Sequence, residues 1–300
     1  MRIKGRTAVV TGASGGIGRA TAHALAARGA KVVVTARRPE ALAAVVAECQ
    51  ARGAEALAVP ADITDAQAVA EVARTAAERF GALDIWINCA AVTAFGPFDA
   101  TPLEIHRRVL DVNVMGYVHG AHAALPYLRQ RPNAVLVNVS SVVGVVAQPY
   151  TTAYTMSKFA NRALGASLRQ ELRLENAGHI KVCSVLPASI DTPIFQQAAN
   201  YTGRRVRPMP PVYRPQWAAR TVVQVIRLPR HEVISGPAGR PLVLASKVAG
   251  AWVERRLAVI VDRKHLSRTE AAALGEGNLY EPTPGRGAVT GGWRARRRGR

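Results

Sequence analysis

Two side chains that could exchange a proton, Tyr154 and Lys158, lie four residues apart in a stretch whose pattern predicts a helix. Residues four apart share one helix face, so the phenol and the ammonium group point the same way. A free phenol has a pKa of about 10 and is a poor base at neutral pH, but a neighbouring ammonium ion favours the phenolate. The spacing alone is weak, because most such pairs lie on solvated helix faces.

Ser141 provides the context that this pair needs. It follows Val139 and Ser140 at the end of a predicted strand, 13 residues before Tyr154 (154 − 141). The carboxyl edge of a doubly wound sheet is where ligands bind. A hydroxyl, a phenol and an ammonium group at this edge predict acid–base chemistry.

A glycine-rich turn, Thr11 to Gly18, joins the first predicted strand to a helix. Glycine permits the tight turn and lets backbone N–H groups approach a pyrophosphate, while the helix N-terminus adds a favourable partial charge. A flexible loop can have the same composition, but the strand–turn–helix context favours a dinucleotide cradle. The candidate cofactor-binding residues of this turn are Gly12, Ser14, Gly15, Gly16, Ile17 and Gly18.

The end of the second predicted strand indicates which dinucleotide is bound. A dinucleotide site usually carries an acidic residue there, which binds the ribose 2′-hydroxyl. Here the sequence is Ala36-Arg37-Arg38, with two guanidinium groups and no carboxylate. This favours a 2′-phosphate, and therefore NADP(H) over NAD(H). Ser14 could add a hydroxyl contact, although a serine in a turn more often bonds its own backbone.

Apolar β-branched runs alternate with amphipathic stretches, which is the pattern of a parallel sheet covered by helices on both faces. We therefore expect an α/β fold with a doubly wound parallel sheet of seven strands and no internal repeat. The predicted strands are Ala8–Thr11, Lys31–Thr35, Ala56–Pro60, Ile85–Asn88, Ala134–Val139, Lys181–Leu186 and Val233–Ser235. The predicted helices are Gly18–Arg28, Pro39–Arg52, Asp65–Phe80, Pro102–Gln130, Tyr154–Asn176 and Pro215–Ile226.

Length and composition exclude several classes of protein. A chain of 300 residues that is 49% hydrophobic has the material for a substantial core. Charges interrupt its apolar runs before the roughly 18 residues that a membrane helix needs, and the basic first residues lead into a strand with no signal segment. Three widely spaced cysteines give neither a metal spacing nor a disulfide framework, so we expect no metal site and a cytoplasmic location.

The net charge of +20 is unevenly distributed. Residues 1–200 carry 20 basic and 14 acidic side chains, a net +6, whereas residues 201–300 carry 20 and 6, a net +14. Arginines gather between Arg294 and Arg300, within a segment rich in glycine, proline and threonine. We interpret this run as a solvated tail and do not expect a nucleic-acid partner, because the tail has little aromatic interleaving.

Four motifs in order along the chain resemble those of the short-chain dehydrogenase/reductases, in their compact single-domain branch. They are Thr11-Gly-x-x-x-Gly16-x-Gly18, Asn113-Val-x-Gly116, Ser141 and Tyr154-x-x-x-Lys158. The resemblance spans residues 3–240 and implies a Rossmann-type fold and an oxidoreductase that interconverts a ketone or aldehyde and an alcohol by hydride transfer. It implies that Tyr154 transfers the proton to the carbonyl oxygen and that Ser141 hydrogen-bonds this oxygen. It also implies that Lys158 binds the nicotinamide ribose and lowers the tyrosine pKa, and that Asn113 holds a water for proton relay.

The resemblance also implies further cofactor contacts. Asp62 and Ile63, after the third strand, are similar to a pair that contacts adenine, although Asp62 could instead cap a helix. Two positions depart from the family pattern: Cys89, which we expect to pack as a small buried residue, and Ala188, where a glycine is usual and an added methyl could shift the nicotinamide. The remaining expected cofactor contacts are Asn88, Ala90, Pro187, Ile190 and Thr192.

Residues 193–217 are similar to a mobile substrate lid, and we expect Gln148, Ser141 and Tyr154 to contact a small carbonyl or alcohol substrate. The lid has two kinds of side chain that bear on the substrate. Its arginines could meet an anionic group, or they could merely be solvated, and both readings stay open. The apolar candidates are Tyr201, Met209, Tyr213 and Trp217, and the arginines are Arg204, Arg205 and Arg207.

We expect residues 1–240 to form the catalytic domain and residues 241–300 a C-terminal extension. Within the extension, Leu242 to Val261 predicts an amphipathic helix that could pack over the substrate pocket, contact another subunit or lie at an anionic membrane surface, ranked in that order. Residues 275–300 are too rich in turn formers to predict an ordered structure.

The resemblance further implies a homodimer or homotetramer, formed through the helices near Pro102 and Tyr154. Two other functions are weighed against catalysis. A regulatory protein that keeps the cofactor cradle without turnover would be supported by loss of a catalytic residue, but all are present. Peripheral association with a membrane, or with nucleic acid, through the basic C-terminus is the second alternative.

Overall fold

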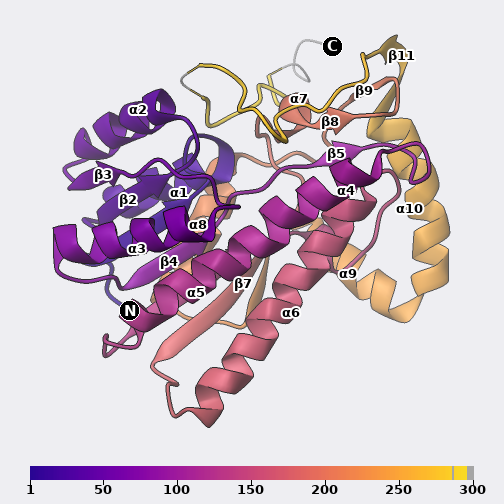
Figure 1. Cartoon of the computed structure of the whole chain (residues 1–300). Coiled ribbons are helices and arrows are strands. Elements are labelled where there is room, and N and C mark those ends of the chain that lie inside the picture. Colours follow the sequence, from indigo (N-terminus) through magenta and orange to yellow (C-terminus); the bar gives the residue numbers. More distant parts are fainter. Residues whose placement is uncertain (286, 296–300) are drawn as a thin grey trace.

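One central sheet of seven parallel strands organises the chain in the computed structural model, which describes residues 1–285 and 287–295 (Figure 1). The strands lie in the order β10-β7-β6-β4-β1-β2-β3, so the chain winds outward in opposite directions from the β1–β4 pair. The carboxyl ends of these two strands therefore flank the crevice where such sheets bind ligands. The strand bounds are β1 Thr7–Thr11, β2 Lys31–Thr35, β3 Ala56–Ala58, β4 Ile85–Asn88, β6 Ala134–Val139, β7 Ile180–Pro187 and β10 Glu232–Ser235. The predicted fold class and strand count are confirmed.

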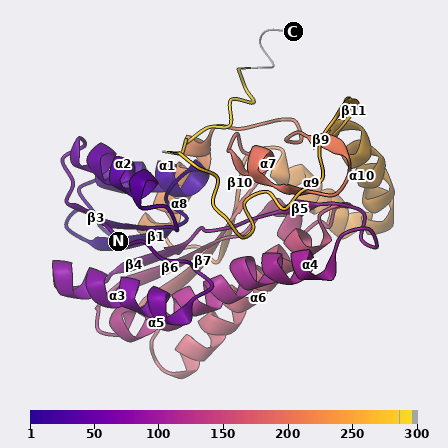
Figure 2. The same cartoon turned by 45° about the horizontal axis from the view of Figure 1, so that its top comes forward.

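Helices cover both faces of the sheet (Figures 1 and 2). Strands β1, β4 and β6 are buried along their whole length, which explains their β-branched composition. Ile85 and Ile87 pack into one apolar core and Trp86 into the other, because alternate side chains of a strand face opposite sides. Helices α1 Gly16–Ala26, α2 Pro39–Gln50 and α8 Pro215–Arg227 lie on one face, and α3 Ala66–Phe80, α4 Leu103–Leu110, α5 Gly116–Leu128 and α6 Thr152–Leu174 lie on the other.

The single helix predicted over Pro102–Gln130 is confirmed as one continuous helical segment, which is distorted in its middle. Helix α4 ends at Leu110, a π-helical turn spans Asp111–Met115, and α5 begins at Gly116. A π turn adds one residue to a helical turn, and such turns occur frequently at functional sites. The apolar periodicity of the sequence is too coarse to reveal it.

Segments between and after the sheet strands form two small additional sheets. Strand β5, Ala94–Phe95, pairs with β8, Ala199–Asn200, and β9, Arg204–Val206, pairs antiparallel with β11, Leu266–Ala271. Helix α7, Ile194–Gln197, precedes β8. The segment predicted to be a substrate lid is thus held to the body of the protein and to the C-terminal extension.

The one helix predicted over Leu242–Val261 is wrong. Two helices, α9 Gly239–Val248 and α10 Gly250–Lys264, meet at Ala249, whose φ of −135° and ψ of 50° lie outside the helical region. Helix α10 buries Val253, Leu257 and Val261. Both helices lie beside α4, at the end of the molecule away from α2 and α3 (Figures 1 and 2).

Residues 278–294, which we call the strap, return across the carboxyl edge of the sheet toward α1 and α2 (Figure 2). Apart from residue 286 the strap has a described path with many contacts, where the sequence had allowed no prediction of order. Most of the predicted basic run, residues 296–300, lies outside the described residues.

None of the described helices has the length and apolarity to cross a bilayer. Within the part of the chain that the structure describes, no group of His, Cys, Asp and Glu could hold a metal ion. Cys49, Cys89 and Cys183 are all free thiols.

Candidate active site

The glycine-rich turn and the loop after β4 lie against each other at the switch point. Gly12 has a φ of 65°, and a Cβ built on it would lie 2.6 Å from the Cα of Ala90. The hydroxyl oxygen of Thr11 accepts hydrogen bonds from the backbone N–H groups of Cys89, at 2.9 Å, and Ala90, at 3.1 Å. Glycine is required at position 12, because no other residue combines this backbone conformation with so close an approach.

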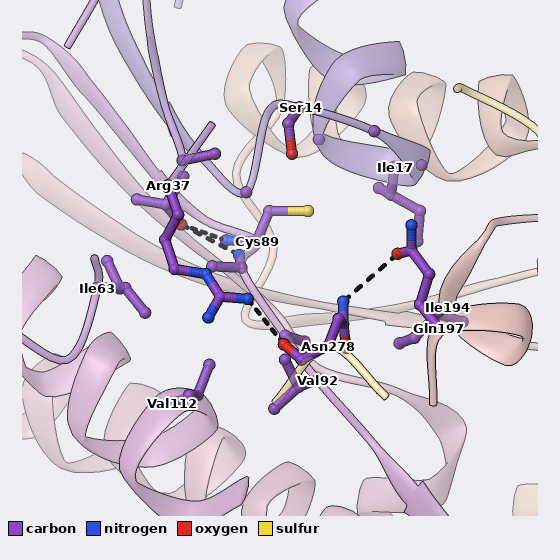
Figure 3. A pocket seen from close by; sticks show the side chains of 18 of the residues that line it. Ser14, Ile17, Arg37, Ile63, Cys89, Val92, Val112, Ile194, Gln197 and Asn278 are labelled. Carbon is purple, nitrogen blue, oxygen red and sulfur yellow. Dashed lines mark hydrogen bonds between the residues drawn. The ribbon is translucent and has the colours of Figure 1, made fainter. Parts of the chain in front are cut away.

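A cleft opens above this contact (Figure 3). It combines backbone N–H groups at the start of α1 with two guanidinium groups at the end of β2, an arrangement that can hold the phosphates of a dinucleotide. Many of the predicted cofactor residues line it. They are Gly12, Ser14, Gly15, Gly16, Ile17, Gly18, Arg37, Arg38, Asp62, Ile63, Ala90, Tyr154, Lys158 and Thr192.

Arg37 and Arg38 both donate hydrogen bonds to main-chain oxygens of the strap. The Arg37 Nη2 donates to the carbonyl of Asn278 at 2.7 Å (Figure 3). Its Nη1 donates to the carbonyl of Tyr280. The Arg38 Nη1 donates to the carbonyl of Gly285 at 2.9 Å. No sequence pattern indicated these partners, which lie more than 200 positions away.

Asp62 is held at the end of β3 by hydrogen bonds. Its carboxylate accepts from the backbone N–H and the hydroxyl of Thr64, both at 2.9 Å, and pairs with Arg108 at 3.3 Å. Burial works to raise the pKa of Asp62, but these hydrogen bonds and the charges of Arg108 and Arg37 hold it below its usual value. The alternative role as a helix cap is wrong, because Asp65 is the N-cap of α3.

Tyr154 and Lys158 lie near the start of α6 and reach the cleft together. The Lys158 ammonium lies 5.3 Å from the centroid of the Tyr154 ring and donates to the Val139 carbonyl at 3.2 Å. Burial raises the pKa of Tyr154 to about 12, an effect that a hydrogen bond with Ser141 opposes. Burial lowers the pKa of Lys158 to about 8. The phenol is therefore protonated at neutral pH in the protein without ligand.

Ser141 lies two residues after the end of β6 and is the N-cap of the 3₁₀ turn Val142–Gly144. Its hydroxyl oxygen accepts from the backbone N–H of Val143 at 3.2 Å, which orients the side chain. Ser141 lines a second cavity, whereas Tyr154 lines both this cavity and the cleft. The phenol thus stands where the two spaces meet.

Asn113 lies in the π-helical turn and lines neither space. Its Oδ1 accepts from the backbone N–H of Val92 at 2.9 Å, and its Nδ2 donates to the Val92 carbonyl at 2.9 Å and to the Ser157 hydroxyl at 3.1 Å. The side chain therefore ties the turn to the loop after β4 and to α6. Because the Asn113 amide already has these partners, a water for proton relay would have to bind the main chain of this turn.

Asn88 holds the start of the loop after β4 in place through hydrogen bonds. It accepts from the Trp86 indole at 2.7 Å and donates to the side-chain oxygen of Asn138 at 3.0 Å and to the carbonyl of Tyr117 at 3.2 Å. It is fully buried and lines neither space. Its amide fixes the start of the loop that carries Ala90.

The remaining predicted residues divide between the two spaces. Pro187, Ile190 and Gln148 line the second cavity, and Thr192 lines both. Ala188 also lines the second cavity. Burial raises the pKa of the Cys89 thiol to about 12, so the thiol is neutral and is not activated as a nucleophile.

The second cavity has a volume of about 220 Å³ and extends from Tyr154 toward α9 and α10. Sequence reasoning missed several of its lining residues, because their segments become neighbours only when the chain folds. They are Phe95, Val146 and His265. The lid residue Phe195 and two residues of the predicted helix, Leu242 and Leu257, also line it, which agrees with the first-ranked expectation that this helix packs over the substrate pocket.

The lid side chains differ from what the sequence suggested. Of its four apolar candidates, only Met209 lines the cavity. The arginines point to carboxylates of the C-terminal extension: Arg204 pairs with Asp262 at 2.6 Å, and Arg205 and Arg207 both pair with Glu270. None of these three arginines lines either space.

Comparisons with known proteins agree with this geometry. A family model described as short chain dehydrogenase matches residues 6–202. The uncharacterized oxidoreductase YxnA of Bacillus subtilis is 31% identical over 98% of this chain and 84% of its own length.

Two solved structures are also similar. A short chain dehydrogenase/reductase from Burkholderia phymatum in complex with NAD is 27% identical, with a TM-score of 0.76 over 85% of this chain and 97% of that one. A short chain dehydrogenase from Burkholderia cenocepacia in complex with NADP is 28% identical, with a TM-score of 0.69. The match covers 80% of this chain and 100% of that one.

Proposed function

Because this chain belongs to the short-chain dehydrogenase/reductase family, we propose that it is an NADP(H)-dependent oxidoreductase that interconverts a ketone or aldehyde with the corresponding alcohol. One observation carries the proposal. Ser141, Tyr154 and Lys158 converge where a cleft rich in phosphate-binding groups meets a largely apolar cavity. A small carbonyl compound in the cavity would present its oxygen to this group.

Each of the three side chains has a distinct role in this proposal. The hydroxyl of Ser141 hydrogen-bonds the substrate oxygen, and the phenol of Tyr154 donates its proton to that oxygen in reduction and accepts a proton in oxidation. The bound nicotinamide supplies or accepts the hydride. Lys158, 5.3 Å from the Tyr154 ring, favours the phenolate and binds the nicotinamide ribose.

The choice of NADP(H) rests on the end of β2. Solved relatives are in complex with NAD in one case and NADP in another, so the family alone does not select the cofactor. Arg37 and Arg38 line the cleft where an acidic residue would bind a free 2′-hydroxyl, and guanidinium groups suit a phosphate. The turn from Gly12 to Gly18 would hold the pyrophosphate, with Asp62 and Ile63 near the adenine.

The substitution Tyr154→Phe tests the reaction class. It removes only the hydroxyl, so carbonyl reduction with NADPH is expected to fall by about 10² to 10⁴, the usual contribution of general acid–base catalysis. Initial rates with a panel of ketones and secondary alcohols, each with NADPH and NADH, provide the measurement. Unchanged reduction by the variant would overturn the assignment, and a clear preference for NADH would overturn the choice of cofactor.

A non-catalytic, cofactor-binding regulator is the alternative from another class. It would predict that the protein binds NADPH with no turnover of any carbonyl in the panel. The complete set of Ser141, Tyr154 and Lys158 in contact with both spaces favours catalysis.

The proposal includes a homo-oligomer located in the cytoplasm. Exposed apolar side chains on α4 and α6 support the first part, with Leu103 79% and Phe159 41% exposed. The three free cysteines support the second, because a reducing compartment keeps thiols free.

A further inference from the structure

No Asp, Glu, Lys or Arg is among the described residues that line the second cavity. Most of its lining residues are apolar, and they come from the segments after β6 and β7 as well as from the lid, α9 and α10. Its polar residues, which include Ser141, Tyr154, Gln148 and Thr151, are uncharged. A charged substrate group would lose its hydration here without gaining an ion pair, which is strongly unfavourable.

The lid arginines do not supply the missing charge, because each is paired with a carboxylate of the extension. Recruiting Arg204 would leave Asp262 with only the longer pair to Arg268, at 3.9 Å, and recruiting Arg205 or Arg207 would remove one of the two arginines of Glu270. The volume of about 220 Å³ exceeds that of an apolar cavity of about 150 Å³ that binds benzene. The space suits a hydrocarbon skeleton of more than one small ring.

His265 is the polar exception among the extension residues of this cavity. It is 4% exposed, and its Nδ1 has no hydrogen-bond partner among the described residues. Phe95 lies edge-on to its ring at 4.9 Å between centroids, and Phe195 lies at 5.7 Å. Burial lowers the pKa of His265 to about 4, so the ring is neutral at physiological pH. The ring also lines the cavity, so the part of this neutral imidazole that faces the cavity can hydrogen-bond a polar group of a ligand.

We propose that the cavity binds an uncharged, largely hydrocarbon ketone or secondary alcohol, and that His265 hydrogen-bonds a second polar group of that substrate, such as a hydroxyl. This inference rests on the proposed function and adds the substrate class and a specificity-determining residue. His265 is contributed by the C-terminal extension, at the end of α10, so the extension completes the substrate site.

Three ketones of one skeleton test the substrate class: cyclohexylcyclohexanone, its analogue with a hydroxyl on the distal ring, and its analogue with a carboxylate there. The kcat/KM of the wild-type enzyme with NADPH is expected to be at least about tenfold lower for the carboxylate than for either neutral ketone. A preference for the carboxylate would overturn the proposed substrate class.

His265→Phe and His265→Asn test the specificity residue. Phenylalanine keeps the packing but cannot hydrogen-bond, so kcat/KM for the hydroxylated ketone is expected to fall about tenfold while that for the plain ketone is retained. Asparagine keeps a hydrogen-bonding side chain at this position and is expected to restore part of the preference. An equal loss on both ketones in the phenylalanine variant would mean that His265 acts only in packing and would overturn its role.

Binding to the Tyr154→Phe variant separates this inference from the proposed function. With NADPH present, calorimetric affinities for the three ketones report the cavity's preference even if no carbonyl is turned over. Tight binding of the neutral ketones without any wild-type reduction would sink the proposed reaction and leave the substrate class standing. Failure of both neutral ketones to bind would overturn the substrate class itself.

A different observation concerns the strap. Its main-chain oxygens accept hydrogen bonds from the groups of the cleft that could bind phosphate. The backbone N–H of Gly16, at the start of α1, donates to the Ala288 carbonyl at 3.0 Å. Arg37 and Arg38 donate to the carbonyls of Asn278 and Gly285. These are the donors that would otherwise face a pyrophosphate and a 2′-phosphate.

The far end of the strap is anchored beside the site. The carboxylate of Asp191 accepts from the backbone N–H groups of Gly291 at 3.0 Å, Trp293 at 2.9 Å and Arg294 at 3.3 Å. The Trp293 indole donates to the Thr192 carbonyl at 3.2 Å. The strap is therefore fixed at both ends of the cleft and cannot leave the phosphate groups without breaking specific contacts.

We infer that the strap competes with the cofactor phosphates, so that the dinucleotide binds only when the strap moves aside. This second proposal also rests on the proposed cofactor. Gly287→Val is designed to displace the strap, because a Cβ at this position would overlap the Ser14 carbonyl oxygen and because Gly287 has a φ of 69°. Removal of residues 282–300 is a second variant, which keeps the buried Leu279.

Dissociation constants for NADPH and NADH, measured by nucleotide fluorescence, give the test. Both variants are expected to bind NADPH at least about fivefold more tightly than wild type, since the bound cofactor no longer has to displace the strap from Gly16 and Arg38. Thr290→Val, at an exposed strap position, is the matched control and is expected to bind as wild type does. An unchanged or weaker affinity in both variants would overturn the competition and show that the strap is neutral or clasps the cofactor.

The NADH arm separates competition from cofactor choice. The contact between Gly16 and Ala288 would oppose the pyrophosphate that both cofactors share, so both variants should gain affinity for NADH as well. A gain for NADH with no binding of NADPH would sink the NADP(H) assignment while supporting the competition.

Discussion

Tyr154 and Lys158 are both shifted by burial away from the protonation states that oxidation requires. Burial raises the pKa of Tyr154 to about 12 and lowers that of Lys158 to about 8. Carbonyl reduction requires the protonated phenol, because the phenol donates its proton to the carbonyl oxygen. Alcohol oxidation requires the phenolate, because the phenolate accepts the proton of the alcohol.

This difference predicts opposite pH dependences for the two directions. Alcohol oxidation should rise with pH toward about pH 12 as the phenolate fraction of Tyr154 grows, whereas carbonyl reduction should not require high pH. Lys158→Met should lower oxidation roughly 100-fold near neutral pH, because the phenolate loses its neighbouring cation. Initial rates across the pH range are the measurement, with the exposed Lys181→Met as control. An oxidation rate independent of pH would contradict the role of the phenol.

The predicted preference for NADP(H) also depends on single residues, Arg37 and Arg38. Alanine at either position should raise the KM for NADPH about tenfold or more, because a charge-assisted hydrogen bond to the 2′-phosphate is lost. The KM for NADH should change little. Arg52→Ala, exposed beyond the end of α2, is the matched control. Equal effects on the two cofactors would show that the arginines do not bind the 2′-phosphate.

At the scale of elements, the π-helical turn between α4 and α5 connects packing to the site. Asn113 uses its amide to satisfy both backbone groups of Val92, which is buried in the loop after β4. The turn therefore positions the loop that carries Ala90, which lines the cleft. Its distortion from a regular helix directs the asparagine side chain to this loop.

Asn113→Ala is expected to lower the free energy of unfolding by about 2 to 4 kcal/mol, because two buried backbone groups lose their partners. Denaturant titration measures the loss, and the Kd for NADPH should rise as the loop loosens. Asn161→Ala is a close control, since Asn161 is also buried but neither atom of its amide has a described partner. A smaller loss at position 113 than at position 161 would contradict the bridging role.

At the scale of the whole molecule, the exposed apolar side chains predict self-association. Phe159 and Met156 on α6 are 41% and 44% exposed, and Leu103 on α4 is 79% exposed. A surface of this kind is expected to be covered by a second copy of the chain. The helices are those that the family resemblance had suggested as an interface.

Phe159→Glu should shift the protein toward the monomer, because a charge buried in an apolar interface has no partner. Light scattering of the eluted protein reports the mass directly. Leu174→Glu, at the exposed far end of α6, is expected to leave the mass unchanged. A monomeric wild-type protein, or a variant of unchanged mass, would exclude this face as the interface.

The sequence by itself determined the sheet, the glycine-rich turn and the grouping of Ser141, Tyr154 and Lys158, because these depend on local patterns. Periodicity marks buried strands, and a strand followed by a turn and a helix has few conformations available. Because the carboxyl ends of parallel strands lie at one edge of the sheet, motifs that are far apart in the sequence come together at that edge.

Only the tertiary structure decided what surrounds the site. The pairing of Arg204 with Asp262 removes a charge that the sequence offered to a substrate, and His265 joins the cavity from a helix that periodicity could not orient. Ala288 reaches Gly16 through a segment with no apolar period at all. Such contacts join residues far apart in the chain through single hydrogen bonds and ion pairs, which leave no pattern in composition or spacing and form only when the fold has brought their partners together.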